Sequence, residues 1–568
     1  MTSIQIDGTK ISFESISLSQ NIHGHHKAWI ECSAKQLGQE DNVIGGEDTS
    51  KLIGKEVVMK MKDKRGTEGE INFVGLVSGI ALHKHHRSYD RVSLSVISKT
   101  VLADSAFNSA TYSEKSLGDI AKAILQPLGK LSIDMKQDLE IPYVCQYRET
   151  AFDFISRMAS KHGHWFYYDG QKMNLGKYQQ EQSIKMKLGP NVGSYHLSLS
   201  LLPLSGSLVH YNYEADEKYE VSSFDAPSPK LDRFGQVVYD ASKETLSEDS
   251  FTASIADFTQ ERELKEFVNT RLGNKAAKLC QLHGDSEDGR IRIGTSIDLV
   301  DRQDNSIGTY VVIEVDHECD AGHNYSNYFK AIPTTIDIPS YNSSLKIPKC
   351  ENQIAVVKEN NDPDALGRVR VQFPWQDQNE KTPWIRVTSP YAGSGDLYFV
   401  PEVKDQVMVG FEFNHPDRPY VIGSLYHGKS KPYFFTEENT TKAIRTKCGH
   451  SIMFEDGDDS QITIVTKDEK HSVVLTLAEG GAINITTAGT MNLEAKEMNL
   501  MADNLNIEAS QNLNLKGADV NIEADQGATI KATNAKMEGS AEVALKGTQA
   551  KVEGDATTTI KGGMVQIN

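Results

Sequence analysis

Residues 483–568 carry an internal repeat with a period of seven or eight residues. Six repeat units contain an apolar–Asn–apolar triplet, such as Leu505-Asn506-Ile507. The second apolar position of the triplet recurs through the whole segment, at Ile485, Leu493, Leu500, Ile507, Leu515, Ile522, Ile530, Met537, Leu545, Val552, Ile560 and Ile567. The residues between these positions are mostly Gly, Ala, Asp, Ser, Thr and Lys, as in tight corners. Such a repeat predicts one structural unit stacked many times.

An apolar–polar–apolar triplet forms a short strand with one buried face, because successive side chains of a strand point to opposite sides. The period leaves room for one such strand and one corner. A single short strand cannot bury its apolar face alone, so the units must stack around a shared core. Two β-helix architectures satisfy this requirement: one chain wound into a prism with about three repeats per turn, or three identical chains intertwined. The repeat alone leaves both open.

The repeat also predicts the dimensions of this shaft. Twelve units stacked ~4.8 Å apart would give a rod of roughly 50–60 Å. After Val520 the first apolar position of each unit is often Ala or Thr, so the core should become thinner toward the C-terminus. The outward positions are Asn, Thr, Lys, Gln and Ala, which leave no large apolar patch outside. A β-sandwich is not favoured, because its hairpins would need more turn residues than the segment contains.

The chain has 568 residues, enough for several domains. Its net charge of −18 argues against a nucleic-acid partner, because phosphate backbones are bound by basic surfaces. The six cysteines are scattered without a CxxC pair, which is typical of free thiols in a reducing compartment. The sequence shows no secretory signal and no stretch apolar enough for a membrane span. If this protein leaves the cell, we therefore expect export without a signal peptide.

Residues 1–345 are predicted to fold mainly as strands with a few helices. One helix is expected within 116–128, and another after Thr150, where Thr150 and Asp153 resemble a capping box and Gly163 stands beyond the helix end. A hairpin turning at Asp169-Gly170 should follow. A further helix is expected near 257–282, and strands at 197–202, 236–239, 290–293 and 310–316.

Histidine clusters at 23–26 and 83–86 raise the question of a metal site, because imidazole is a common metal ligand. Neither cluster has acidic or cysteine residues at a recognisable ligand spacing, so we expect exposed loop histidines. His162 and His164 cannot be paired with a Ser or Cys nucleophile from the sequence. The acidic residues at 285–288 and 301–304 lack the spacing of a calcium loop. The sequence therefore predicts no catalytic residues, no metal and no cofactor.

Residues 350–430 are predicted to form a small OB-fold barrel. Short alternating strands at 367–373, 384–388, 406–413 and 420–423 are separated by Pro, Gly and Asp turns. With a strand from Ile354, they would suffice for a small closed barrel. The segment is not especially basic, and Trp375 and Trp384 are interpreted as core residues. Residues 431–482 are assigned to a neck, and 483–568 to the repeat shaft.

Several long motifs resemble the VgrG spike proteins of type VI secretion systems, which are similar in turn to the hub and spike of contractile phage tails. These motifs are GRVRVQFPW (367–375), WIRVTSPYAG (384–393), VPEVKDQVMVGFEFNHPDRPYVIGSLYHG (400–428) and TKCGHSIMFED (446–456). The segment 146–170 resembles the family's hub signature. The barrel residues that carry the resemblance are Gly367, Arg368, Phe373, Pro374, Trp375, Trp384, Pro416, Asp417, Arg418, Pro419, Gly423 and Tyr426.

The resemblance implies a homotrimer, in which three intertwined chains share the apolar core of the shaft. It also implies a hub of two β-barrel-like subdomains per chain, so that three chains present a pseudo-sixfold base to a hexameric inner tube and a baseplate. A PAAR-type tip protein would bind the shaft end at Gly563, Met564, Val565, Gln566, Ile567 and Asn568. Effector cargo and a transient contact with the target membrane are further implied partners. The resemblance also implies synthesis in the bacterial cytoplasm and export by the contractile machine.

The chain departs from the family pattern in its shaft. The repeat lacks the Val-Gly units typical of the family and uses apolar–Asn–apolar triplets instead. Phage spikes carry a lysozyme domain between barrel and shaft, whereas Gly428 and Ile452 leave no room for one here. We also expect no effector enzyme after the shaft.

We therefore predict the structural tip of a contractile injection machine, which pierces a target membrane and delivers effectors, with type VI secretion favoured. The spike of an extracellular injection particle or of a phage-like tail is an alternative. An enzyme is not favoured, because no G-x-S-x-G, HExxH or P-loop pattern occurs. A glycan-binding fibre, or adhesin, would need an aromatic or acidic stripe along the shaft, and the outward residues do not provide one.

Overall fold

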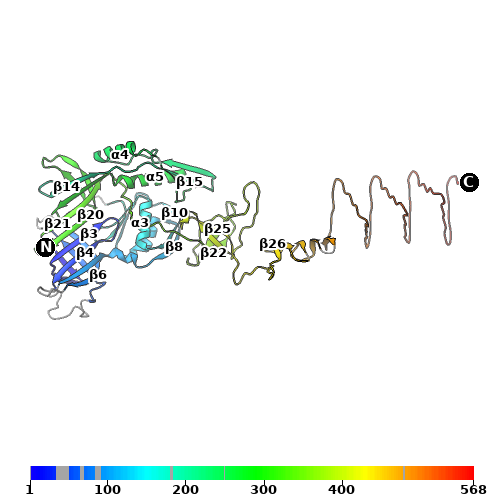
Figure 1. Cartoon of the computed structure of the whole chain (residues 1–568), viewed down its shortest axis with the longest axis horizontal. Coiled ribbons are helices and arrows are strands. Elements are labelled where there is room, and N and C mark those ends of the chain that lie inside the picture. The colour runs from blue at the N-terminus through cyan, green and yellow to red at the C-terminus, as the bar shows by residue number, and fades with distance from the viewer. Residues whose placement is uncertain are drawn as a thin grey trace. The chain divides into compact units, whose positions relative to one another are not determined.

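The computed structural model describes residues 2–33, 50–63, 70–83, 91–178, 183–248, 250–458, 460–477 and 480–567. The chain divides into two compact units, Met1–Tyr433 and Phe434–Asn568. Strands predominate, as predicted, and the first unit also contains helices (Figure 1). Within the described ranges, no helix is long and apolar enough to cross a membrane.

The first unit is built around a large, mainly antiparallel sheet. Its N-terminal strands are β1 (Ser3–Ile6), β2 (Thr9–Ile11), β3 (Ser15–Asn21), β4 (Lys27–Ser33), β5 (Glu56–Met61), β6 (Ile71–His83) and β7 (Arg91–Ser98). They follow the spatial order β3-β4-β7-β6-β5-β1-β2. Alternate residues point inward, and Ile16, Leu18, Met59 and Phe73 are buried in one hydrophobic core.

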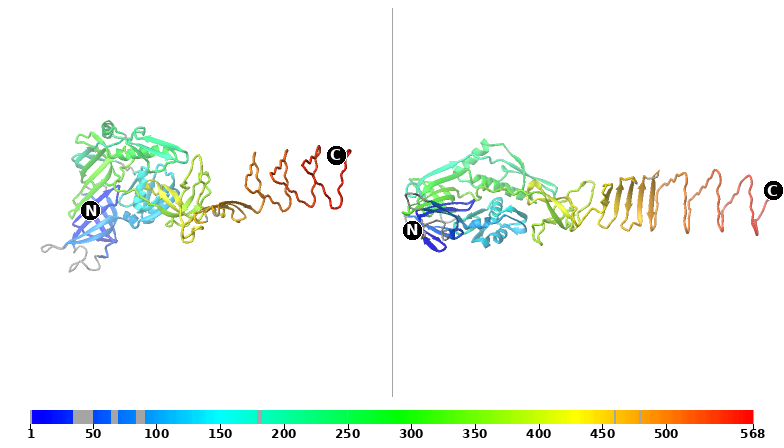
Figure 2. Two further views of the ribbon diagram at one scale, coloured as in Figure 1. Left: turned by 45° about the vertical axis from the view of Figure 1, so that its right-hand side comes forward. Right: turned by 60° about the horizontal axis from the view of Figure 1, so that its bottom comes forward.

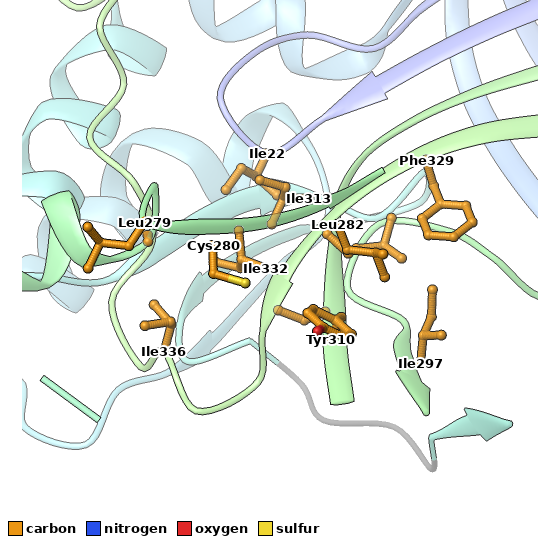
Figure 3. Close-up of a cluster of buried hydrophobic side chains, with 14 of the residues drawn as sticks. Ile22, Leu279, Cys280, Leu282, Ile297, Tyr310, Ile313, Phe329, Ile332 and Ile336 are labelled. Carbon is orange, nitrogen blue, oxygen red and sulfur yellow. The ribbon is translucent and has the colours of Figure 1, made fainter. Parts of the chain in front are cut away.

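A second set of strands extends this sheet. They are β13 (Ile184–Lys187), β14 (Val192–Leu199), β18 (Cys280–Ser286), β19 (Ser296–Val300), β20 (Ser306–Asp320) and β21 (Tyr325–Pro333). The first residues of β20 pair with β19, and its last residues pair with β3, so one long strand joins the two sets. A second core lies here, and Figure 3 shows Leu282, Tyr310 and Phe329 clustered with several isoleucines.

Helices α4 (Arg233–Thr245) and α5 (Glu261–Ala276) contribute to this second core, through residues such as Tyr239 and Leu272. The strand predicted at 236–239 is wrong, because Asp232 caps a helix there by accepting a backbone hydrogen bond at 2.8 Å. The strand predicted at 290–293 is also wrong, since this buried segment forms a turn. A small sheet contacts α5 and consists of β15 (Ser207–Asn212), β16 (Glu217–Ser222) and β17 (Phe251–Ala253).

A mixed α/β segment lies between the two sets of strands in the sequence. It contains η2 (Lys99–Asp104), β8 (Asn108–Ser116), α2 (Leu117–Leu125), η3 (Gln126–Leu128), β9 (Leu131–Asp134), β10 (Glu140–Glu149), α3 (Ala151–Lys161), β11 (Trp165–Tyr168) and β12 (Met173–Gly176). The predictions for this segment are confirmed. The Thr150 hydroxyl accepts a hydrogen bond from the N–H of Asp153 at 3.1 Å, and Gly163 has a φ of +71° beyond the helix end.

The turn between β11 and β12 docks onto β6. The carbonyl of Gly170 accepts a hydrogen bond from the N–H of Val74 at 2.8 Å, and the Tyr168 hydroxyl donates to the carbonyl of Val74 at 3.0 Å. Gly170 has a φ of +101°, and a Cβ atom there would lie 2.1 Å from the carbonyl oxygen of Asn72. Both the conformation and the close approach therefore require glycine.

The predicted small barrel follows the hub. Its strands are β22 (Gln353–Glu359), β23 (Arg370–Gln372), β24 (Gln406–Phe411) and β25 (Pro419–Ser424), with η4 (Glu412–Asn414) before the last. They pair in the order β23-β22-β24-β25. The strand predicted at 384–388 is wrong, because these residues do not form a continuous strand. They nevertheless close the barrel through isolated backbone hydrogen bonds. Ile385 exchanges hydrogen bonds of 2.9 and 3.0 Å with Val369, and Thr388 donates to Val421 at 2.9 Å.

The second unit begins with an antiparallel meander, whose strands stand side by side in the right-hand view of Figure 2. Its strands are β26 (Thr441–Arg445), β27 (Ser451–Glu455), β28 (Gln461–Val465), β29 (His471–Thr476) and β30 (Ala482–Thr487). Cross-strand register places two apolar rows on one face: Ile444, Ile452, Ile464, Val473 and Ile485, and beside them Phe454, Ile462, Leu475 and Ile483. Side chains of these rows are exposed, from 37% for Ile452 to 70% for Ile483, except the half-buried Val473. The first shaft triplet therefore belongs to this meander.

Residues 488–567 trace a regular wave (Figures 1 and 2). Bends recur every seven or eight residues, at 496, 503–504, 510–511, 518–519, 525–526, 533–534, 540–541, 548–549, 555–556 and 563–564. The described residues of this segment contain no strand, and no backbone hydrogen bond joins one repeat to the next. Ile507 is 59% exposed and Leu545 is 74% exposed. One chain thus does not wind into a closed prism, and burial of the twelve repeat positions stays a prediction.

Replacing Gly170 with alanine should destabilise the first unit, because the new Cβ would collide with the carbonyl of Asn72 at a strained φ. We expect the free energy of unfolding to fall by about 2 kcal/mol, measured by urea denaturation. Gly423→Ala is the matched control, because Gly423 has no heavy atom within 4 Å of an added Cβ and no positive φ. Equal unfolding midpoints for the two variants would contradict the close approach.

Candidate functional site

The barrel motif residues gather largely at one place, the joint, which we define as the contacts between residues 1–345 and 350–430. Arg368 forms its most strongly charged part. Its side chain and that of Asp362 are each 3% exposed, and two guanidinium nitrogens donate to the two oxygens of Asp362 at 2.9 Å each. Asp364 binds the same guanidinium. Glu214, in the turn between β15 and β16, pairs with it from the hub side.

This arrangement favours the charged forms of both partners. Hydrogen bonds from Arg368 hold the pKa of Asp362 well below its ordinary value, although burial opposes the shift. Hydrogen bonding to Asp362 also raises the pKa of Arg368. A carboxyl whose pKa is lower in the folded state stabilises the fold above its unfolded pKa of about 4. That contribution is lost as the pH falls below this value.

The turn at 415–419 makes a second contact across the joint. The carboxylate of Asp417 accepts a hydrogen bond from the N–H of Cys145, in β10, at 2.8 Å. Arg418 donates to the carbonyl of Ser254 at 3.4 Å and pairs with Glu412 of the barrel. Pro416 and Pro419 lie within the same turn and at the start of β25. The motif therefore faces the hub, where Asp417 Oδ1 and Arg418 have partners and Asp417 Oδ2 is buried without a hydrogen bond from any described residue.

On the hub side, a buried ion pair supports this contact, and the sequence analysis missed it. Arg157 of α3 donates to both carboxylate oxygens of Glu149, at 2.6 and 3.1 Å, and to the carbonyl of Cys145 at 3.1 Å. Burial raises the pKa of Glu149, and Arg157 opposes that shift. Burial lowers the pKa of His415, also at this joint, to about 4. The sequence offered one signal for this pair, because Arg157 is a charged residue in the segment 151–159, most of whose residues are apolar.

The aromatic motif residues pack the barrel against the hub. The rings of Phe373 and Trp375 stack at 5.3 Å, and Trp375 also lies 6.4 Å from the ring of Tyr147 in β10. The indole N–H of Trp375 donates to Gln353 at 2.8 Å. These rings are engaged inside the protein, so they do not provide the open stacking platform that single-stranded nucleic acid needs.

The other motif residues serve the barrel itself or lie at its surface. Gly367 has a φ of +69° before β23, and Pro374 follows the buried Phe373. The Arg370 guanidinium lies 5.0 Å from the ring centre of Trp384. Gly423 lies within β25, and Tyr426 is 72% exposed.

The predicted histidine clusters do not form a metal site in the described part of the chain. No group of three or more His, Cys, Asp or Glu there could hold a metal ion. The histidines of the first cluster have separate partners: His23 bonds to Ser340, His25 to Thr100 and Asp104, and His26 to Gln20. The expectation of exposed histidines is wrong for this cluster, because His26 is fully buried and His23 and His25 are half-buried. His85 and His86 lie outside the described residues.

The predicted tip-binding residues belong to the second compact unit, whereas the joint residues belong to the first. Residues 563–567 are exposed, including Met564 at 86% and Val565 at 50%. Asn568 lies outside the described residues. Their role as a binding site stays a prediction.

Two protein-family models match the chain in order. Residues 45–322 match the phage tail baseplate hub (GPD). Residues 353–426 match the type VI secretion system/phage-baseplate injector OB domain. The joint lies between these two matched regions, and the shaft lies outside both.

Curated relatives carry spike-protein names. The chain is 24% identical to the type VI secretion system spike protein VgrG3 of Vibrio cholerae, over 62% of this chain and 38% of the relative. It is 25% identical to the spike protein VgrG1a of Pseudomonas aeruginosa, over 59% of this chain and 57% of the relative. Another V. cholerae relative, at 22% identity over 63% of this chain and 35% of the relative, is named actin cross-linking toxin VgrG1. The chain thus spans about a third to just over half of these relatives.

Solved structures share the fold. An Escherichia coli protein, c3393, described as a type VI secretion component similar to the T4 tail proteins gp27 and gp5, matches with a TM-score of 0.52 at 15% identity, over 74% of this chain and 99% of that one. A chain of the half-lidded Francisella PdpA-VgrG complex matches with a TM-score of 0.56 at 11% identity, over 86% and 88%. With the hub and injector OB domains in this order and these relatives, the chain belongs to the VgrG family of spike proteins.

Proposed function

We propose that this chain is the structural spike of a type VI secretion machine, acting as a homotrimer. The observation that carries the proposal is the row of twelve apolar repeat positions that one chain leaves exposed. Exposed apolar area of this extent, repeated at strand spacing, favours assembly, because each side chain gains stability when it is buried. Two further copies of the same chain would supply the other two faces of the shaft. Their repeats have the same length, so their apolar side chains would lie at the same height along the shaft.

The three hub regions would then form a base that docks on a hexameric inner tube and on the baseplate. Two sets of hub strands per chain, joined through β20, support such a pseudo-sixfold base. A PAAR-type tip protein would bind residues 563–568 by pairing with their backbone. Effector cargo would travel with the assembly, which the machine exports through a target membrane.

The joint gives this proposal a mechanical element. A spike driven into a membrane must pass force from hub to shaft without unfolding between them. Arg368 and Asp417 tie the barrel to the hub from two sides, through Glu214 and Cys145. Arg368 is buried, Glu214 is half exposed, and both contacts are ionic or charge-assisted hydrogen bonds, which are shorter and stronger than neutral ones. We infer that the barrel motif is selected for this stiffness.

Other functions have less support. Two of the three curated relatives named above are spike proteins, which favours a mechanical role, whereas the third is named a toxin. An extracellular injection particle or a phage-like tail would use the same hub and barrel, but the spike-protein relatives favour type VI secretion. Phe373 and Trp375 are engaged in packing, so these two barrel aromatics do not support a glycan-binding fibre.

Removing one partner of the buried Arg368 pair should loosen the joint. Asp362→Ala leaves the guanidinium with only its exposed carboxylates, so we expect a loss of about 3 kcal/mol in the free energy of unfolding at pH 7. Asp364→Ala is the matched control, because Asp364 is 66% exposed and its removal should cost less than about 1 kcal/mol. The difference between wild type and Asp362→Ala should shrink below about pH 4, where Asp362 begins to be protonated in the unfolded chain. Urea denaturation across pH 3–7 would measure both effects, and equal losses for the two variants would contradict the assignment.

The intertwined shaft predicts opposite results for two neighbouring positions. Leu505→Asp would place three charges at one level of the core, and burying unpaired charge costs several kcal/mol per group. We expect sedimentation velocity to show loss of the trimer for this variant. Asn506→Asp changes the outward residue of the same triplet and should leave the trimer intact. Identical sedimentation of both variants would show that position 505 does not face the core.

The secretory role can be tested in the bacterium that encodes the chain. Deleting the gene should abolish contraction-dependent release of the inner-tube protein into the medium, measured by immunoblotting. The wild-type chain and Asn506→Asp should restore release, and Leu505→Asp should not. Normal tube release from the deletion strain, in the absence of another spike gene, would contradict the proposal.

A further inference from the structure

A cavity of about 730 Å³ lies in the first unit, between α3, α5 and the segment 252–256. This segment begins within β17 and continues into the loop after it. Leu202, Ile255 and Phe267 form part of an apolar wall. Ile255 is 42% exposed and Ile347, at the same cavity, is 49% exposed, so the cavity is open to solvent. Its size and largely apolar wall are those of a small-molecule site.

The charged side chains that line this cavity are basic. The side chains of Arg157, Lys161, Arg271, Lys275 and Lys278 line it, and none of the described residues lining it is acidic. This composition is opposite to that of the whole chain, whose net charge is −18. The charge at the cavity therefore favours an anionic occupant.

Several of these polar groups lack a partner. Arg157 is paired with Glu149, but among the described residues no hydrogen bond or ion pair involves the ammonium of Lys161. Burial lowers the pKa of Lys161, which means that its charged form is poorly solvated. Ser160 Oγ and Asn274 Oδ1, from residues that line the same cavity, are buried without a hydrogen-bond partner. Lys161 and Ser160 both line the cavity, so the ammonium of Lys161 and the hydroxyl of Ser160 can both donate to one anionic group there.

We propose that this cavity binds an amphiphile with one anionic head group on an alkyl chain, such as a fatty carboxylate. The head group would accept hydrogen bonds from Lys161 and Ser160, and the alkyl chain would lie against Leu202, Ile255 and Phe267. A short anion would satisfy the ammonium but leave the apolar wall in water, whereas a neutral alkyl chain would leave Lys161 unpaired. The inference rests on the cavity and does not depend on the proposed spike function.

Isothermal titration of the full-length chain tests this proposal with four probes. Decanoate has an alkyl chain with a carboxylate head group, and decyl phosphate has the same chain with a phosphate head group like that of a lipid. Decanol has the chain without the charge, and acetate has the charge without the long chain. We expect saturable binding of decanoate or decyl phosphate with one site per chain, and the tighter of the two identifies the source of the head group. Decanol and acetate should bind at least tenfold more weakly, the factor that one charge-assisted hydrogen bond or a few buried methylenes supply.

Matched variants locate the site. Lys161→Met should weaken decanoate binding about tenfold or more and leave decanol binding unchanged. Lys122→Met, an exposed lysine of α2, should bind decanoate like wild type. Ile255→Asp should weaken both ligands, whereas Ile53→Asp, another exposed isoleucine outside the cavity, should weaken neither.

Thermal unfolding of each variant checks that the first unit is folded, and Lys161→Arg, which keeps the charge, should retain binding within about threefold. The proposal is overturned if neither anionic amphiphile binds, or if decanol binds as tightly as decanoate. It is also overturned if Lys161→Met and Lys122→Met bind decanoate equally.

Discussion

The apolar face of the repeat is the constraint on which the structure of the second unit depends. One chain cannot cover it, since Leu493, Leu515 and Ile530 are each at least 70% exposed. Burying an aliphatic side chain of this size stabilises a fold by roughly 2 kcal/mol. Over twelve positions per chain, this favours a closed core by more than the net stability of an ordinary domain. The backbone imposes the same requirement, because strands without neighbours leave their N–H and C=O groups unpaired.

The meander before the repeat fits the same account. Its two apolar rows lie on one face, one with partners in register across five strands and the other across four, and that face is open in one chain. Three such sheets facing one another would enclose these rows before the repeat begins. The meander makes its own hydrogen bonds within one chain, whereas the repeat cannot. The meander can therefore form first and bring three repeats together in register, which lowers the entropic cost of starting the shaft.

The sequence predicted local structure best where the responsible residues are neighbours. The Thr150 cap, the Gly163 helix end and the Asp169-Gly170 turn depend on contacts within a few residues, and all three are present. The strand prediction at 236–239 is wrong because its Val-Val-Tyr run has the β-branched and aromatic residues typical of strands, whereas the Asp232 cap and the contact with the core favour a helix. The Val369–Ile385 closure of the barrel needs only two backbone hydrogen bonds, so a full strand was too much to expect there.

The sequence identified the motif residues of the candidate site, but it did not show that they lie in the joint between barrel and hub. Arg368 and Asp417 stand out in the sequence, yet their partners Glu214 and Cys145 are more than a hundred residues away. No local pattern announces a contact of that separation. The Glu149–Arg157 pair spans only eight residues, but its burial depends on the barrel that packs above β10 and α3. The same limit applies to the cavity beside α5, whose wall comes from distant segments.

The most direct test of this account is the mass of the purified full-length chain in solution, measured by light scattering on a sizing column. The account predicts a particle of three chains, each of 62.9 kDa, because only shared strands can bury the repeat. A stable monomer with a soluble, protease-resistant repeat would contradict it, since one chain would then have covered its own apolar face.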